Sequence, residues 1–165
     1  MEQAMTKHEI EAVLREVTDE EVAFYQEYGW VMMKQLVDPD FATELLNVGQ
    51  AWLDENDEEK RRRETCLAMQ EETEPFRSFV FSQRMSKNAM RLINRKRLKG
   101  VDLPLRYRTD VFREKPPGAA VTQYHQDSAQ HGSDRVGELQ FWLAMAEVTP
   151  EMSAMRFVSR SHREG

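Results

Sequence analysis

The chain has 165 residues, of which 40% are hydrophobic and 32% charged, and its formal net charge is −6 at pH 7. A chain of this length corresponds to one domain with a buried core. Membrane spanning is excluded, because no stretch approaches the roughly 20 consecutive apolar residues that a spanning helix needs. Cys66 is the only cysteine, which excludes an intrachain disulfide and a multi-cysteine zinc site. The polar N-terminus does not resemble a signal peptide, so we expect a cytoplasmic protein.

Charge is unevenly distributed along the chain. Residues 1–59 hold 3 basic and 16 acidic residues, residues 60–113 hold 15 and 6, and residues 114–165 hold 5 and 7. The basic middle segment could attract an anionic partner, such as a coenzyme A thioester. The alternative is a solvated helical surface whose charge the acidic N-terminal segment balances. Nucleic acid is not favoured as a partner, because the basic residues are not interleaved with aromatic residues that could stack on bases.

Helix-start signals come first in chain order. Thr6 with Glu9, and Thr18 with Glu21, have the spacing of a capping box, in which each side chain bonds a free amide of the first turn. The first helix is predicted to end near residue 17. The second is predicted to stop at Gly29, because glycine tolerates the left-handed conformation of a helix end.

Further elements of the helical half follow from capping and periodicity. An Asp-Pro pair at residues 38–39 predicts a helix over 40–54, since proline is favoured in the first helical turn. Residues 85–98 carry apolar side chains at helical spacing and predict another helix. The apolar segments 30–34 and 76–81 predict short strands.

The pattern changes to a period of two after about residue 100. Apolar and polar side chains alternate over 105–112, which predicts a half-buried strand. Residues 119–124, 137–148 and 154–159 are further predicted strands. Helices followed by strands indicate a single α+β domain over residues 1–165, helical over 1–100 and β-rich over 101–165.

The strongest chemical signal is a His-x-Asp pair, His125 and Asp127. In a strand these two side chains would share a face and could offer a nitrogen and an oxygen to one cation. Such a pair makes up two of the three ligands in the facial triad of non-haem Fe(II) oxygenases. The alternative is a surface or hydrogen-bonded histidine without a metal.

Several motifs occur around this pair in one order. They are Lys-Pro-Pro-Gly at 115–118, Tyr-His-Gln-Asp at 124–127, Trp-Leu-Ala at 142–144, Val-Thr-Pro-Glu at 148–151 and a segment ending in Ser-Arg-Ser-His at 159–162. Together they resemble the phytanoyl-CoA dioxygenase family. Residues 20–46 resemble the opening of that family, where a helix ending at a glycine leads into a strand and a second helix.

The resemblance implies an Fe(II)- and 2-oxoglutarate-dependent dioxygenase. The implied fold is a double-stranded β-helix, also called a jelly roll or cupin-like core, preceded by helices. His125 and Asp127 match the first two iron ligands, and Trp142 matches an aromatic position near the cosubstrate. Two turns depart from the family pattern: Met-Ser at 152–153 replaces Asn-Gly, and Ser-Arg at 159–160 replaces Pro-Gly.

The family's third ligand, a histidine, and its cosubstrate arginine lie further downstream than the residues of this sequence. We therefore expect a core and a metal site that the 165 residues do not complete, with His131, His162 and Arg163 as poor substitutes.

The implied reaction hydroxylates a small organic substrate with dioxygen while 2-oxoglutarate is oxidised. Asp127 favours hydroxylation, because halogenating relatives have a small residue at its position. Two alternatives remain: a catalytically inactive fragment or non-catalytic binding module on the same scaffold, and an ordinary α+β domain without a metal.

Overall fold

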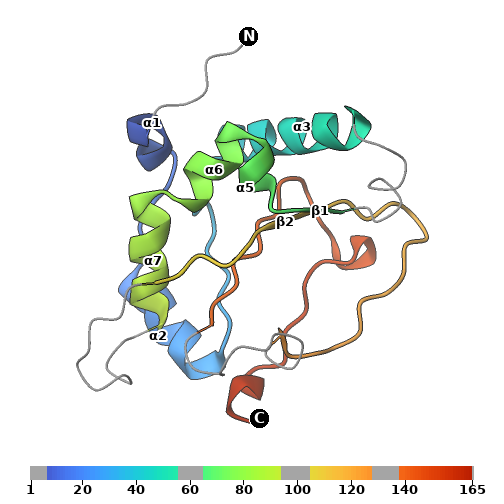
Figure 1. Cartoon of the computed structure of the whole chain (residues 1–165). Helices are drawn as coiled ribbons and strands as arrows, with labels where there is room; N and C mark the ends of the chain where they lie inside the picture. Colours follow the sequence, from blue (N-terminus) through green and yellow to red (C-terminus); the bar gives the residue numbers. More distant parts are fainter. Residues whose placement is uncertain (1–6, 56–64, 94–104, 128–137, 165) are drawn as a thin grey trace.

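The computed structural model describes residues 7–55, 65–93, 105–127 and 138–164. Helices α1 (Lys7–Ala12), α2 (Asp19–Tyr28) and α3 (Pro39–Glu55) are followed by α5 (Met69–Glu72), α6 (Glu74–Val80) and α7 (Gln83–Ile93). Figure 1 shows α3, α5 and α6 across the top of the molecule and α2 beside α7 at its left. Beyond α7 the chain runs mainly as extended segments over the remaining side.

Sheet structure in the described residues is small. Strand β1 (Thr65–Leu67) pairs antiparallel with β2 (Val111–Arg113), so that Cys66 lies opposite Phe112. An isolated antiparallel bridge joins Leu14 to Val37. The turns η3 (Pro150–Met152) and η4 (Ser161–Arg163) are short 3-10 helices.

The second and third helices predicted from capping signals are confirmed as α2 and α3. The first helix ends at Ala12 rather than near residue 17, because the main chain of residues 13–15 instead bonds that of residues 36–38. Thr18 accepts a hydrogen bond from the Glu21 amide, and the Glu21 carboxylate accepts one from the Thr18 amide. Gly29 ends α2 with a left-handed φ of 81°. Thr6 lies outside the described residues, and the helix predicted over 85–98 is α7 as far as Ile93.

The two strands predicted in the helical half are wrong. Residues 30–34 form no strand, and residues 76–81 lie mostly in helix α6. Pro75 stands in the first turn of α6, where its missing amide costs no hydrogen bond. Phe76 and Phe79 are three residues apart and therefore share one helix face, from which they meet the rings of Phe112 and Phe41.

The prediction for residues 101–165 has a mixed outcome. Within the described part of this segment, β2 is the strand that pairs in a sheet. The strands predicted over 119–124 and 154–159 are not formed. Residues 138–146 nevertheless alternate between exposed and half-buried side chains, as a half-buried extended segment does. The double-stranded β-helix is not confirmed.

The core lies between the helices and β2. Its fully buried apolar side chains are Ile10, Val17, Leu45, Met69 and Leu92. Leu139, Phe141, Leu143 and Met145 pack against it from the extended C-terminal half. At Gly49, in the middle of α3, a Cβ atom would stand 2.4 Å from the ring of Phe112, so the missing side chain lets β2 approach the helix.

Candidate metal site

The two residues of the His-x-Asp pair lie side by side. His125 Nε2 is 3.1 Å from Asp127 Oδ1, and the two side chains are 39% and 37% exposed. They meet although residues 119–126 form no strand, so the strand geometry expected from the sequence is not what joins them. Two ligands held about 2.1 Å from one metal at right angles lie about 3 Å apart. The observed separation fits adjacent positions on one cation, and it also fits a direct hydrogen bond from a protonated His125 to Asp127.

The hydrogen bond of His125 Nδ1 leaves Nε2 as the ring nitrogen available to a metal. Nδ1 lies 2.7 Å from the main-chain oxygen of Gln123. Because a carbonyl oxygen only accepts hydrogen bonds, Nδ1 carries a proton. In the neutral ring Nε2 is then an acceptor that faces the carboxylate of Asp127, and two acceptors at this distance repel unless a proton or a cation lies between them. Metal-binding histidines are commonly oriented in this way.

A third ligand is not present in the described part of the chain. No group of three histidine, cysteine, aspartate or glutamate side chains that could hold a metal occurs there. His162 packs against the end of α2, where a Cβ on Gly29 would stand 2.2 Å from its Nδ1. His131 lies outside the described residues. The described residues thus supply two donors of the kinds that Fe(II) binds, and a third would come from elsewhere.

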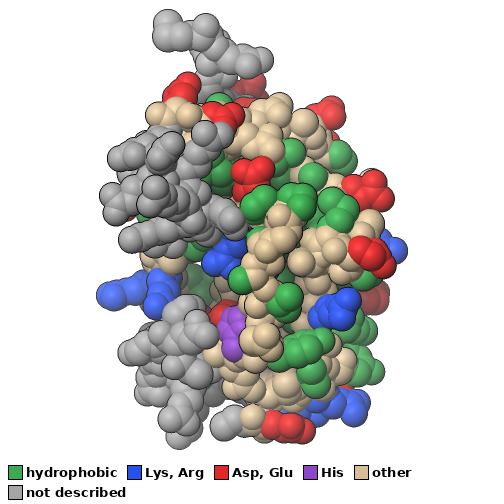
Figure 2. Space-filling model, turned by 90° about the vertical axis from the view of Figure 1, so that its right-hand side faces the viewer, with side chains coloured by type: hydrophobic (Ala, Val, Ile, Leu, Met, Phe, Trp, Pro, Cys, Tyr) green, Lys and Arg blue, Asp and Glu red, His purple; other side chains and the backbone are tan. Residues whose placement is uncertain are grey.

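Trp142 lies on the exposed side of the alternating segment 138–146. Its side chain is 51% exposed, whereas its neighbours Phe141 and Leu143 pack toward the core. Other large apolar side chains of the C-terminal half are also exposed: Val121, Tyr124, Met152, Met155, Phe157 and Val158. Figure 2, turned toward this side of the molecule, shows hydrophobic groups on its surface.

Several of the basic residues that suggested an anionic partner form ion pairs with the acidic N-terminal segment. Arg84 lies 3.3 Å from Glu16, and Arg91 lies 2.5 Å from Asp19. Arg91 also donates to the main-chain oxygen of Val17. These contacts favour the interpretation of α7 as a helix whose charge its neighbours balance.

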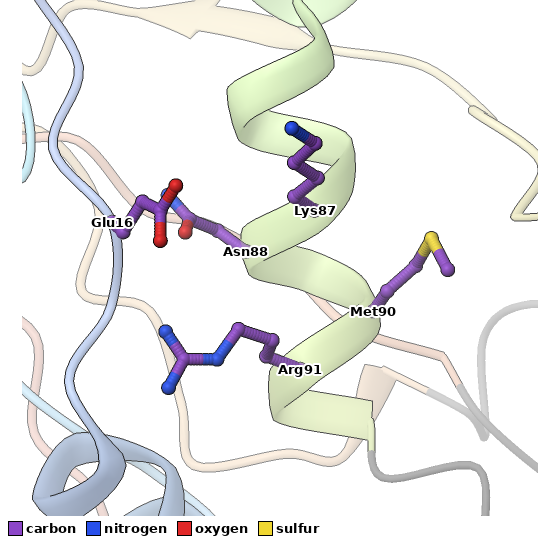
Figure 3. A pocket seen from close by; sticks show the side chains of 5 residues that line it. All are labelled: Glu16, Lys87, Asn88, Met90 and Arg91. Carbon is purple, nitrogen blue, oxygen red and sulfur yellow. The ribbon is translucent and has the colours of Figure 1, made fainter.

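A pocket of about 350 Å³ lies beside α7, lined by Glu16, Lys87, Asn88, Met90 and Arg91. Figure 3 shows Asn88 and Arg91 extending toward the segment that carries Glu16, whereas Met90 extends from the other side of the helix. None of the lining residues belongs to the His-x-Asp pair. This pocket is therefore separate from the candidate metal site.

Two ion pairs that the sequence pattern does not indicate anchor η4 to α2. Glu27 binds both Arg160 and Arg163, with nitrogen–oxygen distances of 2.7 and 2.9 Å. The paired residues are more than 130 positions apart, and nothing in their sequence pattern indicates that they meet. Gln126, between the two candidate ligands, donates to the main-chain oxygen of Ser161 at 3.0 Å.

The two departures from the family's turns have a conformational explanation. Ser153 and Arg160, which stand where the family has glycine, both have φ values of 68°. They keep the left-handed conformation that glycine adopts most easily. The turns are thus retained without their usual residues.

An imidazole and a carboxylate 3.1 Å apart, in a chain whose N-terminal half is helical, are compatible with a candidate mononuclear non-haem metal protein. The chain matches the phytanoyl-CoA dioxygenase (PhyH) family over residues 25–165 and belongs to that family. Members are generally Fe(II)- and 2-oxoglutarate-dependent oxygenases, and the family implies a cupin-like fold. Comparisons with curated proteins and with solved structures give no match. In the described residues, no helix combines the length and apolar character needed to cross a membrane.

Proposed function

We propose that this chain is a non-haem Fe(II)- and 2-oxoglutarate-dependent dioxygenase that hydroxylates a small organic substrate, with His125 and Asp127 as two of the metal ligands. The observation that carries the proposal is the orientation of His125. Its Nδ1 is held on the Gln123 oxygen, and its Nε2 lies 3.1 Å from Asp127 Oδ1. Family membership supports the choice of metal and cosubstrate.

The donor set fits Fe(II) chemically. A neutral imidazole and a carboxylate are two of the three side chains in the facial arrangement used by non-haem Fe(II) oxygenases. When bound, the iron would supply the oxidation of an unactivated C–H bond with dioxygen while 2-oxoglutarate is converted to succinate and carbon dioxide. The protein's own residues would bind the metal, orient the substrate and exclude water.

Particular residues carry these tasks in the proposal. Asp127 supplies negative charge to the cation and occupies the position that favours hydroxylation over halogenation. Trp142 is the proposed cosubstrate-contacting residue, and its exposed ring leaves it available for such a contact. Since the pair is more than one third exposed, water exclusion needs further residues than those described.

The proposed substrate is a small organic molecule, with an anionic or coenzyme A-linked compound as the class that the basic middle segment suggested. Arg84 and Arg91 form ion pairs with Glu16 and Asp19, so their positive charge attracts an anionic substrate less strongly. The proposed enzyme uses dioxygen as a cosubstrate. It has a single domain with a double-stranded β-helix core, and its proposed location is the cytoplasm.

The alternative is a non-catalytic binding module on the same scaffold. It is favoured by the finding that the described residues offer two metal ligands rather than three. The two functions differ in whether the chain binds Fe(II) and 2-oxoglutarate together.

An anaerobic titration of the full chain tests the proposal. Fe(II) followed by millimolar 2-oxoglutarate is expected to give a weak visible charge-transfer band, which His125→Ala and Asp127→Ala remove. Gln140→Ala, at an exposed position in the alternating segment, is the matched control and is expected to keep the band. Metal binding without a band supports the binding module. If metal binding does not depend on His125, the proposed hydroxylase is contradicted and the binding module is supported.

A further inference from the structure

The candidate ligands are connected to the rest of the molecule through the residue between them. Gln126 Nε2 donates to the main-chain oxygen of Ser161 at 3.0 Å and approaches that of Glu164 at 3.5 Å. Both acceptors belong to η4 or to the residue that follows it. Within the described part of the chain, these bonds link residues 124–127 to a segment remote in sequence.

The turn that receives these bonds is itself fixed to α2. The Arg160 amide donates to the main-chain oxygen of Tyr28 at 2.8 Å. The Arg160 guanidinium lies 5.3 Å from the centre of the Tyr28 ring, and it binds one oxygen of the Glu27 carboxylate. Arg163 binds the other oxygen of that carboxylate and the main-chain oxygen of Glu27.

Neighbouring aromatic contacts extend the same attachment. The indole of Trp30 donates to Ser159 Oγ at 3.0 Å. Its ring stacks on Phe157 with centroids 5.7 Å apart and an interplanar angle of 7°. The segment 157–163 is therefore held on the end of α2 by stacking, hydrogen bonds and ion pairs together.

Glu27 stands at an unfavourable place for a lone carboxylate. It lies in the last turn of α2, which carries no basic residue of its own, and the negative end of the helix dipole disfavours a second negative charge there. Arg163 and Arg160 supply the compensating positive charge from the far end of the chain. Arg160 also has a conformational cost to offset. Its backbone is left-handed, with φ 68°, which is unfavourable for a residue with a side chain, and its contacts with Glu27 and Tyr28 offset that cost.

We propose that Gln126 is a positioning residue of the candidate metal site, which ties the His125–Asp127 segment to a turn that Glu27 anchors on α2. The inference rests on the proposed function, because it concerns the orientation of the two ligands. Residues 124–126 are exposed and Asp127 is half-buried, and none of the four joins a ladder within the described residues, so the direction of this segment depends on such side-chain bonds. Loss of the Gln126 bonds would let the two ligands separate before a metal binds.

The test uses the full chain and Co(II), an air-stable probe with visible bands that report the ligand set. Gln126→Met keeps the length of the side chain and removes the donor. It is expected to weaken Co(II) binding by about tenfold or more, as the loss of groups that orient metal ligands does. The metal-free thermal unfolding midpoint is expected to stay at the wild-type value, which a purely structural role would not allow. Gln140→Met is the matched control and keeps wild-type affinity.

The anchor is tested separately. Glu27→Gln is expected to weaken Co(II) binding in the same direction and to speed tryptic cleavage after Arg160 and Arg163, a readout that needs no metal. Glu55→Gln, at the end of α3, is the control for the charge change. Because both changes act through one connection, the double variant is expected to bind Co(II) no more weakly than Gln126→Met alone.

The outcomes distinguish the positioning role of Gln126 from the proposed metal site itself. If His125→Ala abolishes Co(II) binding while Gln126→Met leaves affinity and bands unchanged, the positioning role is wrong and the metal site stands. If the chain shows no His125-dependent binding up to millimolar Co(II), the proposed function is wrong and the positioning role falls with it. Weakened binding in Gln126→Met at an unchanged unfolding midpoint supports the inference.

Discussion

The carboxamide of Asn88 completes the main-chain hydrogen bonding of Val17. Asn88 Oδ1 accepts from the Val17 amide at 3.0 Å, and its Nδ2 donates to the Arg15 oxygen at 2.9 Å. The side chain is fully buried at 0% exposure. It therefore satisfies two main-chain groups in the segment between α1 and α2, next to the isolated bridge between Leu14 and Val37.

Replacing this carboxamide is expected to destabilise the fold. Asn88→Leu leaves a buried amide and a carbonyl without partners, and each unsatisfied group costs about 1–3 kcal/mol. Chemical denaturation is expected to show a loss of about 2–6 kcal/mol in the free energy of unfolding. Asn47→Leu, at an exposed position of α3, is the control and is expected to change it by less than about 0.5 kcal/mol. Equal losses in both variants would contradict the role given to Asn88.

The contact between Gly49 and Phe112 predicts an unusual outcome for a helical glycine. Alanine in a helix interior is normally better than glycine by about 1 kcal/mol. Here the new methyl group would stand 2.4–2.7 Å from three ring atoms of Phe112, and such overpacking costs about 1–3 kcal/mol. Gly49→Ala is therefore expected to lower the free energy of unfolding.

A second variant distinguishes overpacking from other causes. Phe112→Leu removes the ring atoms that the methyl group would meet, so Gly49→Ala is expected to cost less in that background. The free energies of the four proteins in this cycle are compared by denaturant titration. Additive losses would show that the ring is not what opposes the methyl group.

Local signals predicted the helices well and the sheet poorly, for a physical reason. A capping box such as Thr18 with Glu21 acts within four residues, so the sequence alone shows it. The partner of a strand is remote: β2 pairs with β1 more than 40 residues away, and residues 138–146 keep the alternation of a strand without a ladder in the described residues. Segment 76–81 was mispredicted because its aromatic content outweighed the helix-start signal of Pro75.

In the candidate site, too, local features could be predicted from the sequence and contacts between remote residues could not. His125 and Asp127 were predicted from spacing and from the motifs around them, and the structure places their side chains 3.1 Å apart. The orientation of His125 by the Gln123 oxygen and the anchoring of η4 by Glu27 could not be predicted. A main-chain acceptor has no residue identity, and an ion pair between residues far apart in sequence leaves no local pattern.

The Arg15–Glu21 pair predicts a pH dependence of stability. The bonds from Arg15, with a smaller contribution from the Thr18 amide, hold the pKa of Glu21 below its ordinary value. A carboxylate with a lowered pKa in the folded state stabilises it above the unfolded-state pKa, about 4.3 for glutamate. The stabilisation is lost as the pH falls through the lower pKa of the folded state.

Glu21→Gln removes this dependence and is compared with the unchanged chain from pH 7 down to pH 3. The free energies of unfolding are expected to differ most at neutral pH and to converge in acid. The expected difference at pH 7 is about 1 kcal/mol, because the pair is partly exposed and its interaction is screened by solvent. A difference that grows as the pH falls would contradict the sign of the shift.

If Asp127 is a metal ligand, the thermal stability of the chain is expected to depend on metal, which can be measured without enzyme turnover. A ligand that binds only the folded state raises stability by about 2.7 kcal/mol at one hundred times its Kd. The thermal midpoint of the chain is therefore expected to rise with Co(II) concentration. Asp127→Asn keeps the shape of the side chain and removes its charge, so the same Co(II) series is expected to give a much smaller rise. Glu114→Gln, an exposed charge change outside the pair, is expected to respond as the unchanged chain does. An equal rise in Asp127→Asn would place the bound metal elsewhere, since a carboxylate ligand cannot lose its charge without loss of affinity.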